Sequence, residues 1–206
     1  MTIQAVVFDI GNVLLEWQPE AYYDAHIGAD RRKALFAEVP LEAMNLEVDR
    51  GAPFRKSVED LAAAHPAWAD EIMMWHDCWL DIASPAIDHS ARLMKAVQAT
   101  GMPVFSLTNF GIDTYEIAAE AYPILRDFDR DFISGHMKEI KPDARIYEML
   151  EDGAGLSGEA LIFTDDRADN IAAAQARGWR THLFEGPQGW ADRLVAEGIL
   201  TADQAV

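Results

Sequence analysis

The fold of this chain is decided by the stretch Val6-Val7-Phe8-Asp9-Ile10-Gly11-Asn12-Val13-Leu14-Leu15. Its apolar, strand-forming residues indicate a buried strand, and Asp9 stands where that strand ends, shortly before a glycine. In open α/β sheets, ligands bind at the carboxyl ends of the strands. An aspartate there also serves as a turn or helix-cap residue. The rest of the chain therefore has to decide whether Asp9 has a chemical role.

The composition is that of a folded, acidic protein. Of the 206 residues, 50% are hydrophobic and 25% are charged, which suffices for a sizeable core in one domain or in one domain with an insert. The formal charge is -18, and the 17 Lys and Arg residues form no cluster, which argues against nucleic acid as a partner. An anionic substrate therefore needs local cations or a metal to bind.

Cysteine content and hydropathy bear on the compartment. Cys78 is the single cysteine, so an internal disulfide is excluded. The sequence contains neither a signal-peptide pattern nor a run of about 20 apolar residues. We therefore expect a cytoplasmic protein without a membrane partner, and both a monomer and a homodimer are compatible with the sequence.

A series of helical patterns separates the first strand from the next one. The patterns are interrupted by glycine and proline, which punctuate helices, and they cover residues 31–38, 41–48, 53–64 and 67–82. A connection of about 70 residues is too long for an ordinary βα loop. We expect a helical sub-domain over residues 17–85, inserted into a core formed by residues 1–16 and 86–206.

Helix and strand patterns alternate after Pro85. The predicted strands are residues 103–109, 128–134, 160–164 and 181–184. The predicted helices are residues 87–100, 112–121, 147–150, 168–176 and 190–196. This alternation predicts an α/β fold with a doubly wound parallel sheet.

Polar residues follow three of the predicted strands. They are Asp9, Thr108 with Asn109, and Asp165 with Asp166. Because the carboxyl ends of parallel strands lie along one edge of a sheet, we expect these side chains to converge in one crevice. Lys141 lies in a loop between the last two of these groups.

Such a cluster predicts metal-assisted phosphoryl chemistry. Three adjacent carboxylates raise one another's pKa unless a cation neutralises them, and oxygen ligands with water suit Mg²⁺. The metal and Lys141 would offset the charge on phosphoryl oxygens, Thr108 would donate a hydrogen bond, and Asp9 would attack in line to give an aspartyl-phosphate. In the simpler alternative, the two aspartates after residue 164 only cap the following helix.

Four ordered motifs resemble those of the haloacid dehalogenase-like hydrolase superfamily. They are residues 8–14, the strand ending in Thr108-Asn109, Lys141-Pro142 with Tyr147, and residues 163–166 with Asn170-Ile171. The resemblance runs from residue 4 to about residue 185, and the helical insert is similar in position to that superfamily's α-helical cap.

The resemblance implies a Rossmann-like core and a set of roles for the motif residues. Asp9 would be the nucleophile, and Thr108 and Lys141 would contact the transferred group. Asp9, Asp165, Asp166 and the backbone carbonyl of Gly11 would lie around Mg²⁺.

Gly11 departs from the usual pattern of the superfamily's phosphatases. They resemble one another in a second aspartate at this position, which protonates the leaving alcohol and then activates water. Glycine transfers no proton, so an acid-base contribution of about 10²- to 10⁴-fold is missing from its usual place. Either the leaving group needs little help, or the insert supplies the donor, or the protein binds without turnover. Candidate donors in the insert are His26, Glu47, Asp49 and His76.

The motif forms favour one subgroup. Residues 9–13 and 165–170 are most similar to a subgroup that includes an α-D-glucose-1-phosphate phosphatase, which favours hydrolysis of a small sugar phosphate. A 2-haloacid dehalogenase is the main rival, because that branch also lacks the second aspartate and needs no metal. It would leave Asp165 and Asp166 unbalanced beside the nucleophile. A sugar-phosphate mutase or other phosphotransferase, and a non-catalytic protein that binds a phosphorylated metabolite, are further alternatives.

Aromatic residues of the insert are candidates for substrate contact. Trp17 lies near its start, and Trp75, His76 and Trp79 crowd one short segment. Packing between helices explains the same residues equally well. We assign Trp17 and His76, together with Asn109 beside the second motif, as candidate substrate-binding residues.

Overall fold

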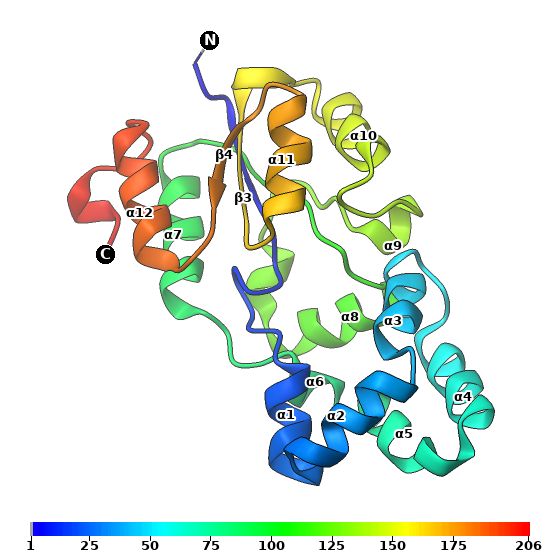
Figure 1. Ribbon diagram of the computed structural model, residues 1–206. Helices are drawn as coiled ribbons and strands as arrows, with labels where there is room; N and C mark the ends of the chain where they lie inside the picture. The colour runs from blue at the N-terminus through cyan, green and yellow to red at the C-terminus, as the bar shows by residue number, and fades with distance from the viewer. Residues whose placement is uncertain (1) are drawn as a thin grey trace.

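A computed structural model describes residues 2–206 (Figure 1). Its centre is a parallel sheet in the order β2-β1-β3-β4. The strands are β1 (Ala5–Phe8), β2 (Val104–Ser106), β3 (Leu161–Asp165) and β4 (Arg180–Leu183). The central strand β1 is fully buried, which explains why its sequence is continuously apolar instead of alternating.

Helices cover both faces of the sheet, as the predicted doubly wound fold requires. Those that follow the first strand's long connection are α7 (Asp88–Ala99), α8 (Ile112–Ala121), α9 (Ser134–Met137), α10 (Ala144–Ala154), α11 (Ala168–Ala176) and α12 (Pro187–Ala196). Val6 and Phe8 point to the face covered by α7 and α12, where the Phe8 and Trp190 rings meet edge to face at 5.6 Å. Ala5 and Val7 point to the face covered by α10 and α11. The predicted α/β class is therefore confirmed.

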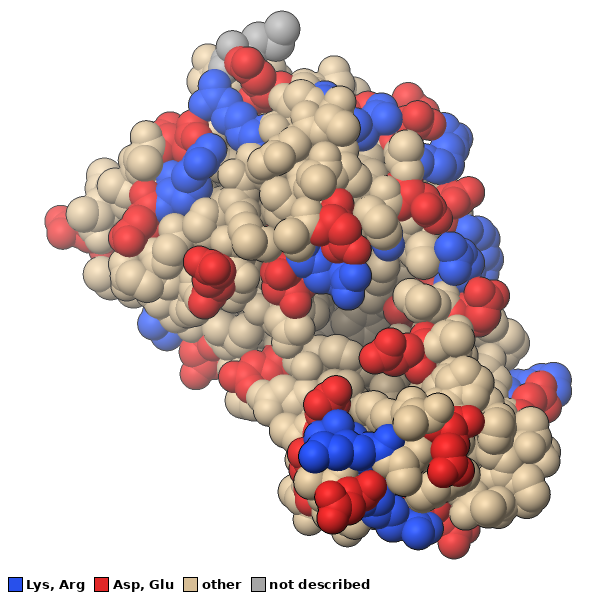
Figure 2. All heavy atoms as spheres, viewed as in Figure 1, with Lys and Arg blue, Asp and Glu red and all other residues tan. Residues whose placement is uncertain are grey.

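The connection between β1 and α7 consists of helices, which we call the helical insert. Its members are α1 (Pro19–Ile27), α2 (Ala29–Glu38), α3 (Leu41–Asp49), α4 (Phe54–Ala64), α5 (Ala69–Asp77) and α6 (Trp79–Ile82). Figure 1 shows them gathered beyond the carboxyl ends of the strands, and Figure 2 shows the surface hollowed between them and the core. Tyr23, Leu35 and Trp75 are among their buried side chains.

Short 3-10 turns complete the structure. They are η1 (Pro66–Trp68), η2 (Pro123–Arg126), η3 (Gly158–Ala160) and η4 (Ala202–Gln204). Within residues 2–206 no helix combines the length and the apolar character needed to cross a bilayer.

The prediction of a continuous strand over residues 128–134 is wrong. The segment runs beside β2, but it forms only isolated parallel bridges, between Phe105 and Arg130 and between Thr108 and Ile133. Charged residues interrupt its apolar pattern, and the Asp129 carboxylate itself accepts a hydrogen bond at 2.8 Å from the Val104 N–H. Side-chain acceptors thus replace part of the regular ladder.

One helical prediction is divided in the structure, and two helices were not predicted. The helix expected over residues 67–82 starts as the 3-10 turn η1, continues as α5 to Asp77 and resumes as α6 at Trp79. Helix α1 begins at Pro19, and α9 is a single turn; neither has a sequence pattern long or regular enough to predict it.

Gly135 is sterically crowded and Gly11 is not, so the two positions should differ in how they tolerate an alanine. A Cβ on Gly135 would lie 2.8 Å from Ile112 N and 2.9 Å from Phe110 O, whereas a Cβ on Gly11 would meet no heavy atom within 4 Å. We expect Gly135→Ala to lower the free energy of unfolding by about 1–3 kcal/mol, since backbone has to move. Gly11→Ala should change it by less than about 0.5 kcal/mol. Urea unfolding measures both, and equal stability of the two variants would contradict this account of the packing.

Candidate active site

The carboxyl ends of two neighbouring strands bring three carboxylates together. Asp9 follows β1, Asp165 ends β3, and Asp166 is the next residue. Phe8 lies opposite Thr164 in the parallel register, so the residues that follow each of them are neighbours. One oxygen from each of the three carboxylates lies within 4.8 Å of the others. The three carboxylates at these strand ends therefore lie together, as the sequence predicts.

A buried ammonium group lies among these carboxylates. Lys141 Nζ is 2.9 Å from Asp9 Oδ1 and 2.6 Å from Asp165 Oδ2, and it donates a hydrogen bond to the Leu107 carbonyl at 2.8 Å. The three partners use all three N–H donors of the ammonium. The side chain of Lys141 is 1% exposed, so this cation serves the cluster and not the surface.

The loop that carries Lys141 is held by Asn109. Asn109 Oδ1 accepts a hydrogen bond from the Lys141 N–H at 2.8 Å, and Asn109 Nδ2 donates to the Lys141 carbonyl at 3.0 Å. The structure therefore engages both polar ends of an amide that we predicted to bind substrate. It gives Asn109 a positioning contact with the lysine.

Asp165 is held by the start of α11. Asn170 Nδ2 lies 3.0 Å from each oxygen of the Asp165 carboxylate, and the Arg167 N–H donates to its Oδ1 at 2.8 Å. The Tyr147 hydroxyl donates to the Asn170 carbonyl at 3.0 Å, which fixes the helix start from the other side. Asn170 was given no role from the sequence. Its position five residues after Asp165, at the start of a predicted helix, was a signal that its side chain contacts that carboxylate.

Asp166 is tied to the first motif through Asn12. Asn12 Nδ2 donates to Asp166 Oδ2 at 2.9 Å, and Asn12 Oδ1 accepts from the Trp17 N–H at 2.9 Å. Asn12 has a φ of 54°, in the left-handed region that asparagine tolerates better than most residues. Asn12 lies within the first motif but was given no role from the sequence, because its carboxylate partner Asp166 is far away along the chain.

Burial dominates the electrostatics of the cluster. It raises the pKa of Asp9 to about 7; Lys141 opposes this rise, and Asp165 and Asp166 add to it. Burial also raises the pKa of Asp166. For Lys141, burial acts to lower the pKa, but Asp165 and Asp9 outweigh it and the net shift is upward. The cluster therefore combines one ammonium group with three carboxyl groups, and its charges are not balanced.

This donor set fits a hard divalent cation. Carboxylate oxygens of Asp9, Asp165 and Asp166 lie within 4.8 Å of one another. Their combined negative charge exceeds the positive charge of the single lysine among them. Mg²⁺ prefers such oxygen ligands and keeps several waters. Gly11 forms a short bridge with Leu15 beside Asp9, and the part of its carbonyl in a metal site stays a prediction.

Thr108 stands at the end of β2. It is 1% exposed, and its backbone N–H donates to the Phe132 carbonyl at 3.2 Å while its carbonyl accepts from the Ser134 N–H at 3.0 Å. The backbone of Thr108 is thus fixed on both sides. Its predicted hydrogen bond to a transferred group stays a prediction.

The predicted aromatic residues lie where the helical insert meets the core. The Trp17 ring is 5.6 Å from the Trp75 ring and 6.0 Å from the Trp79 ring, and Trp79 in turn lies 5.5 Å from Phe110 after β2. Trp75 and Trp79 are buried, as the packing interpretation holds.

His76 packs at 5.0 Å against Phe54, with its Nδ1 2.8 Å from Asp77 Oδ1. Substrate contacts of Trp17 and His76 stay predictions.

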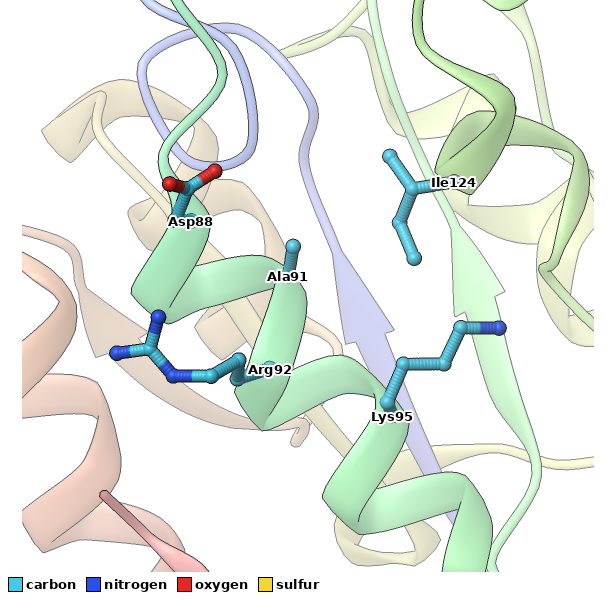
Figure 3. A pocket seen from close by; sticks show the side chains of 5 residues that line it. All are labelled: Asp88, Ala91, Arg92, Lys95 and Ile124. Atoms are coloured by element: carbon cyan, nitrogen blue, oxygen red, sulfur yellow. The ribbon is translucent and has the colours of Figure 1, made fainter.

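A separate surface pocket lies along α7 (Figure 3). It has a volume of about 420 Å³ and is lined by Asp88, Ala91, Arg92, Lys95 and Ile124. Lys95 pairs with Asp127 at 2.6 Å, so its charge is already engaged. None of the predicted site residues lines this pocket.

The fold and the cluster together define a class of protein. A Rossmann-like parallel sheet, with carboxylates at the ends of adjacent strands and a lysine between them, is the framework of an enzyme with an acidic active site. The model of the haloacid dehalogenase-like hydrolase family matches residues 3–178, and the chain belongs to this family.

Two curated fungal proteins are similar in sequence. The chain is 24% identical over 187 residues to drimenol cyclase drtB of Aspergillus calidoustus, covering 88% of this chain and 34% of the cyclase. The chain thus spans about a third of the length of that protein. It is 23% identical over 178 residues to sesquiterpene phosphatase astK of Aspergillus oryzae, covering 86% of this chain and 87% of the phosphatase.

Solved structures share the fold. The HAD family enzyme bt-2542 of Bacteroides thetaiotaomicron superposes with a TM-score of 0.74 at 19% identity, covering 94% of this chain and 99% of that chain. The same enzyme in complex with magnesium and inorganic phosphate gives a TM-score of 0.66 at 19% identity, over 87% and 93% of the chains. A dehalogenase gives 0.65 at 22% identity, over 87% and 83%.

Replacement of Lys141 should destabilise the fold, because the buried carboxylates lose their counter-charge. We expect Lys141→Met to lower the free energy of unfolding by about 3–5 kcal/mol, because Asp9 and Asp165 lose their common cation in a buried site. The loss should be larger at pH 8 than at pH 5.5. Without the ammonium, the folded-state pKa of Asp9 rises further, so folding takes up protons and stability falls as pH rises. Denaturant unfolding at the two pH values measures this.

Lys56→Met is the matched control. Lys56 is 70% exposed and pairs with Asp60 one helical turn away. Its loss should leave the free energy of unfolding almost unchanged at either pH, because solvent screens an exposed ion pair. Similar costs for the two variants would show that the buried ion pairs do not stabilise the fold.

Proposed function

We propose that this hydrolase is a Mg²⁺-dependent phosphohydrolase that cleaves a small phosphate monoester through an aspartyl-phosphate on Asp9. The observation that carries the proposal is the contact of a buried carboxylate with Lys141, beside two further carboxylates suited to a cation. The similar sesquiterpene phosphatase and the magnesium and phosphate complex of a structural neighbour support it.

The surroundings of Asp9 suit a nucleophile. Its Oδ1 accepts hydrogen bonds from the Ile10 N–H at 2.7 Å and faces Lys141 Nζ at 2.9 Å. Oδ2 is then the oxygen that attacks phosphorus while the bond to the leaving oxygen breaks. Water subsequently attacks the phosphorus of the aspartyl-phosphate and releases inorganic phosphate.

Other residues of the chain would stabilise the transferred group. The charge of Lys141 would offset that of the phosphoryl oxygens, and the Thr108 hydroxyl would donate a hydrogen bond to one of them. Asp9, Asp165, Asp166 and the Gly11 carbonyl would hold the metal. A bound Mg²⁺ would offset the negative charge that the phosphoryl group carries. Asn12 and Asn170 keep two of these carboxylates in place.

We propose that residues 17–85 act as a cap over a core formed by residues 1–16 and 86–206. Support comes from contacts across the boundary, where the Phe54 N–H donates to Asp113 Oδ2 at 3.0 Å. A cap that closes over the strand ends excludes bulk water, which favours phosphoryl transfer over side reactions.

For the substrate, we propose a small phosphorylated metabolite, with a sugar phosphate first. The forms of residues 9–13 and 165–170 support a sugar phosphate, while the similarity to a sesquiterpene phosphatase supports testing isoprenoid phosphates beside it. The metal-independent dehalogenase is disfavoured by two carboxylates next to Asp9, which need a cation to balance them.

A phosphate-release screen tests this function. We expect turnover of at least one sugar, isoprenoid or acyl phosphate in the presence of Mg²⁺ and its loss with a chelator, because the acidic cluster then lacks its counter-ion. Inorganic phosphate is measured. Metal-independent chloride release from 2-chloropropionate would overturn the proposal in favour of a dehalogenase. Binding without any turnover would favour a binding protein.

The nucleophile is tested by Asp9→Asn. We expect phosphate release to fall at least about 10³-fold, because an amide oxygen does not form the covalent intermediate. Thermal unfolding should show a folded protein, since an amide of equal size retains the packing. An active Asp9→Asn protein would rule out the aspartyl-phosphate mechanism.

A further inference from the structure

We propose that Asp49, the last residue of α3, donates the proton to the leaving oxygen and afterwards accepts one from the attacking water. This inference rests on the proposed phosphohydrolase function and names a catalytic group that the strand ends do not contain. Gly11 has open space for a side chain but no proton to give. A side chain that protonates the leaving oxygen therefore has to come from another element than the strand that carries Gly11.

The end of α3 is docked on the core loops that carry the site. The Ser134 hydroxyl donates to the Asp49 carbonyl at 2.6 Å, and Lys138 Nζ donates to the Gly51 carbonyl at 3.2 Å. A Cβ on Gly111 would lie 2.6 Å from Val48 Cγ1. The last turn of α3 thus lies directly against the loop that follows Thr108 and Asn109.

The Asp49 carboxylate is held by a hydrogen bond within its own helix and lies near the core loop at Gly111. Asn45 Nδ2 donates to Asp49 Oδ2 at 3.1 Å, and the backbone N–H of Gly111 acts on the same carboxyl group to lower its pKa. Trp75 Nε1 donates to Asn45 Oδ1 at 3.1 Å, which sets the direction of the Asn45 amide. A buried indole therefore fixes the partner of the acid.

The surroundings of Asp49 suit an acid that works near neutral pH. Burial raises its pKa to about 7, while the Gly111 N–H, the charge of Lys141 and the Asn45 amide act in the opposite direction. A group with such a pKa is present in both protonation states near pH 7, which general acid and base steps require. Lys141 also contacts Asp9, so Asp49 lies within the electrostatic reach of the reacting cluster.

The other candidate donors of the insert face elsewhere. His26 is exposed, stacks on Tyr22 at 4.0 Å and contacts the Tyr22 carbonyl at 2.7 Å. Glu47 is 67% exposed and faces Arg50. His76 packs on Phe54 and contacts its neighbour Asp77, as described above. Of the four, Asp49 is the one whose carboxyl group meets the core loop.

The proton balance closes over two steps. In the first, the Asp9 oxygen bonds to phosphorus, the bond from phosphorus to the leaving oxygen breaks, and that oxygen takes the proton of Asp49. In the second, the Asp49 carboxylate takes a proton from water, the water oxygen bonds to phosphorus, and the Asp9–phosphorus bond breaks. Asp49 is then protonated again, and alcohol and inorganic phosphate are the products.

A series of aryl phosphates with Asp49→Asn tests this role. The probes are 4-nitrophenyl, 4-chlorophenyl and phenyl phosphate, whose leaving groups need increasing protonation. In the variant we expect kcat/KM to fall about 10²-fold or more for phenyl phosphate and less than about 10-fold for 4-nitrophenyl phosphate. The plot of log kcat/KM against leaving-group pKa should therefore become steeper than for the wild type.

The controls separate this inference from the proposed function. Glu47→Gln, on the exposed side of the same helix, should leave the whole plot unchanged, and thermal unfolding should show that Asp49→Asn is folded. A wild type inactive on every phosphate would refute the phosphohydrolase function itself. An active wild type with an equal loss, or no loss, on all three probes in Asp49→Asn would refute the proton-donor role alone.

Discussion

The buried ammonium of Lys141 is the interaction on which the rest of the site depends. Parallel strands force Asp9 and Asp165 into proximity, and two carboxylates removed from water repel one another unless a cation lies between them. The chain solves this with a lysine from a distant loop, and Asn109 clamps the backbone of that loop. Three separate segments thus define the position of Asp9, and the position of each segment depends on the other two.

The helical insert is attached to this site at more than one place. Its start is held where Asn12 joins the Trp17 backbone, and the end of α3 rests on the loop after β2 through Ser134. Between these points, rings of the insert such as Trp79 reach Phe110 of the core. The insert therefore brings groups to the strand ends that the sheet does not carry.

Local patterns predicted what depends on local physics. Helix α11 was predicted with the bounds it has, and the carboxylates after the first and third observed strands were found because buried strands read as apolar runs. The prediction for residues 128–134 failed because a side chain of the segment itself, the Asp129 carboxylate, accepts the Val104 N–H and the regular ladder is interrupted. Asn12 and Asn170 lie in the quoted motifs but were given no role, because the carboxylates that they bind are brought close only by the fold. The same limit left Asp49 as one of four equal candidates until its hydrogen bonds were known.

The single amide of Asn12 has a consequence for regulation of the site. One end of it holds Asp166 in the acidic cluster, and the other holds the backbone at which the insert begins. A displacement of Asp166 therefore shifts the Asn12 amide, and the shifted amide changes its hydrogen bond with the Trp17 backbone. Thermodynamic linkage is reciprocal. If a cation bound to the carboxylates favours one orientation of the helical insert, that orientation raises the affinity of the carboxylates for the cation by the same factor. In this chain one side chain joins the acidic cluster to the start of the helical insert.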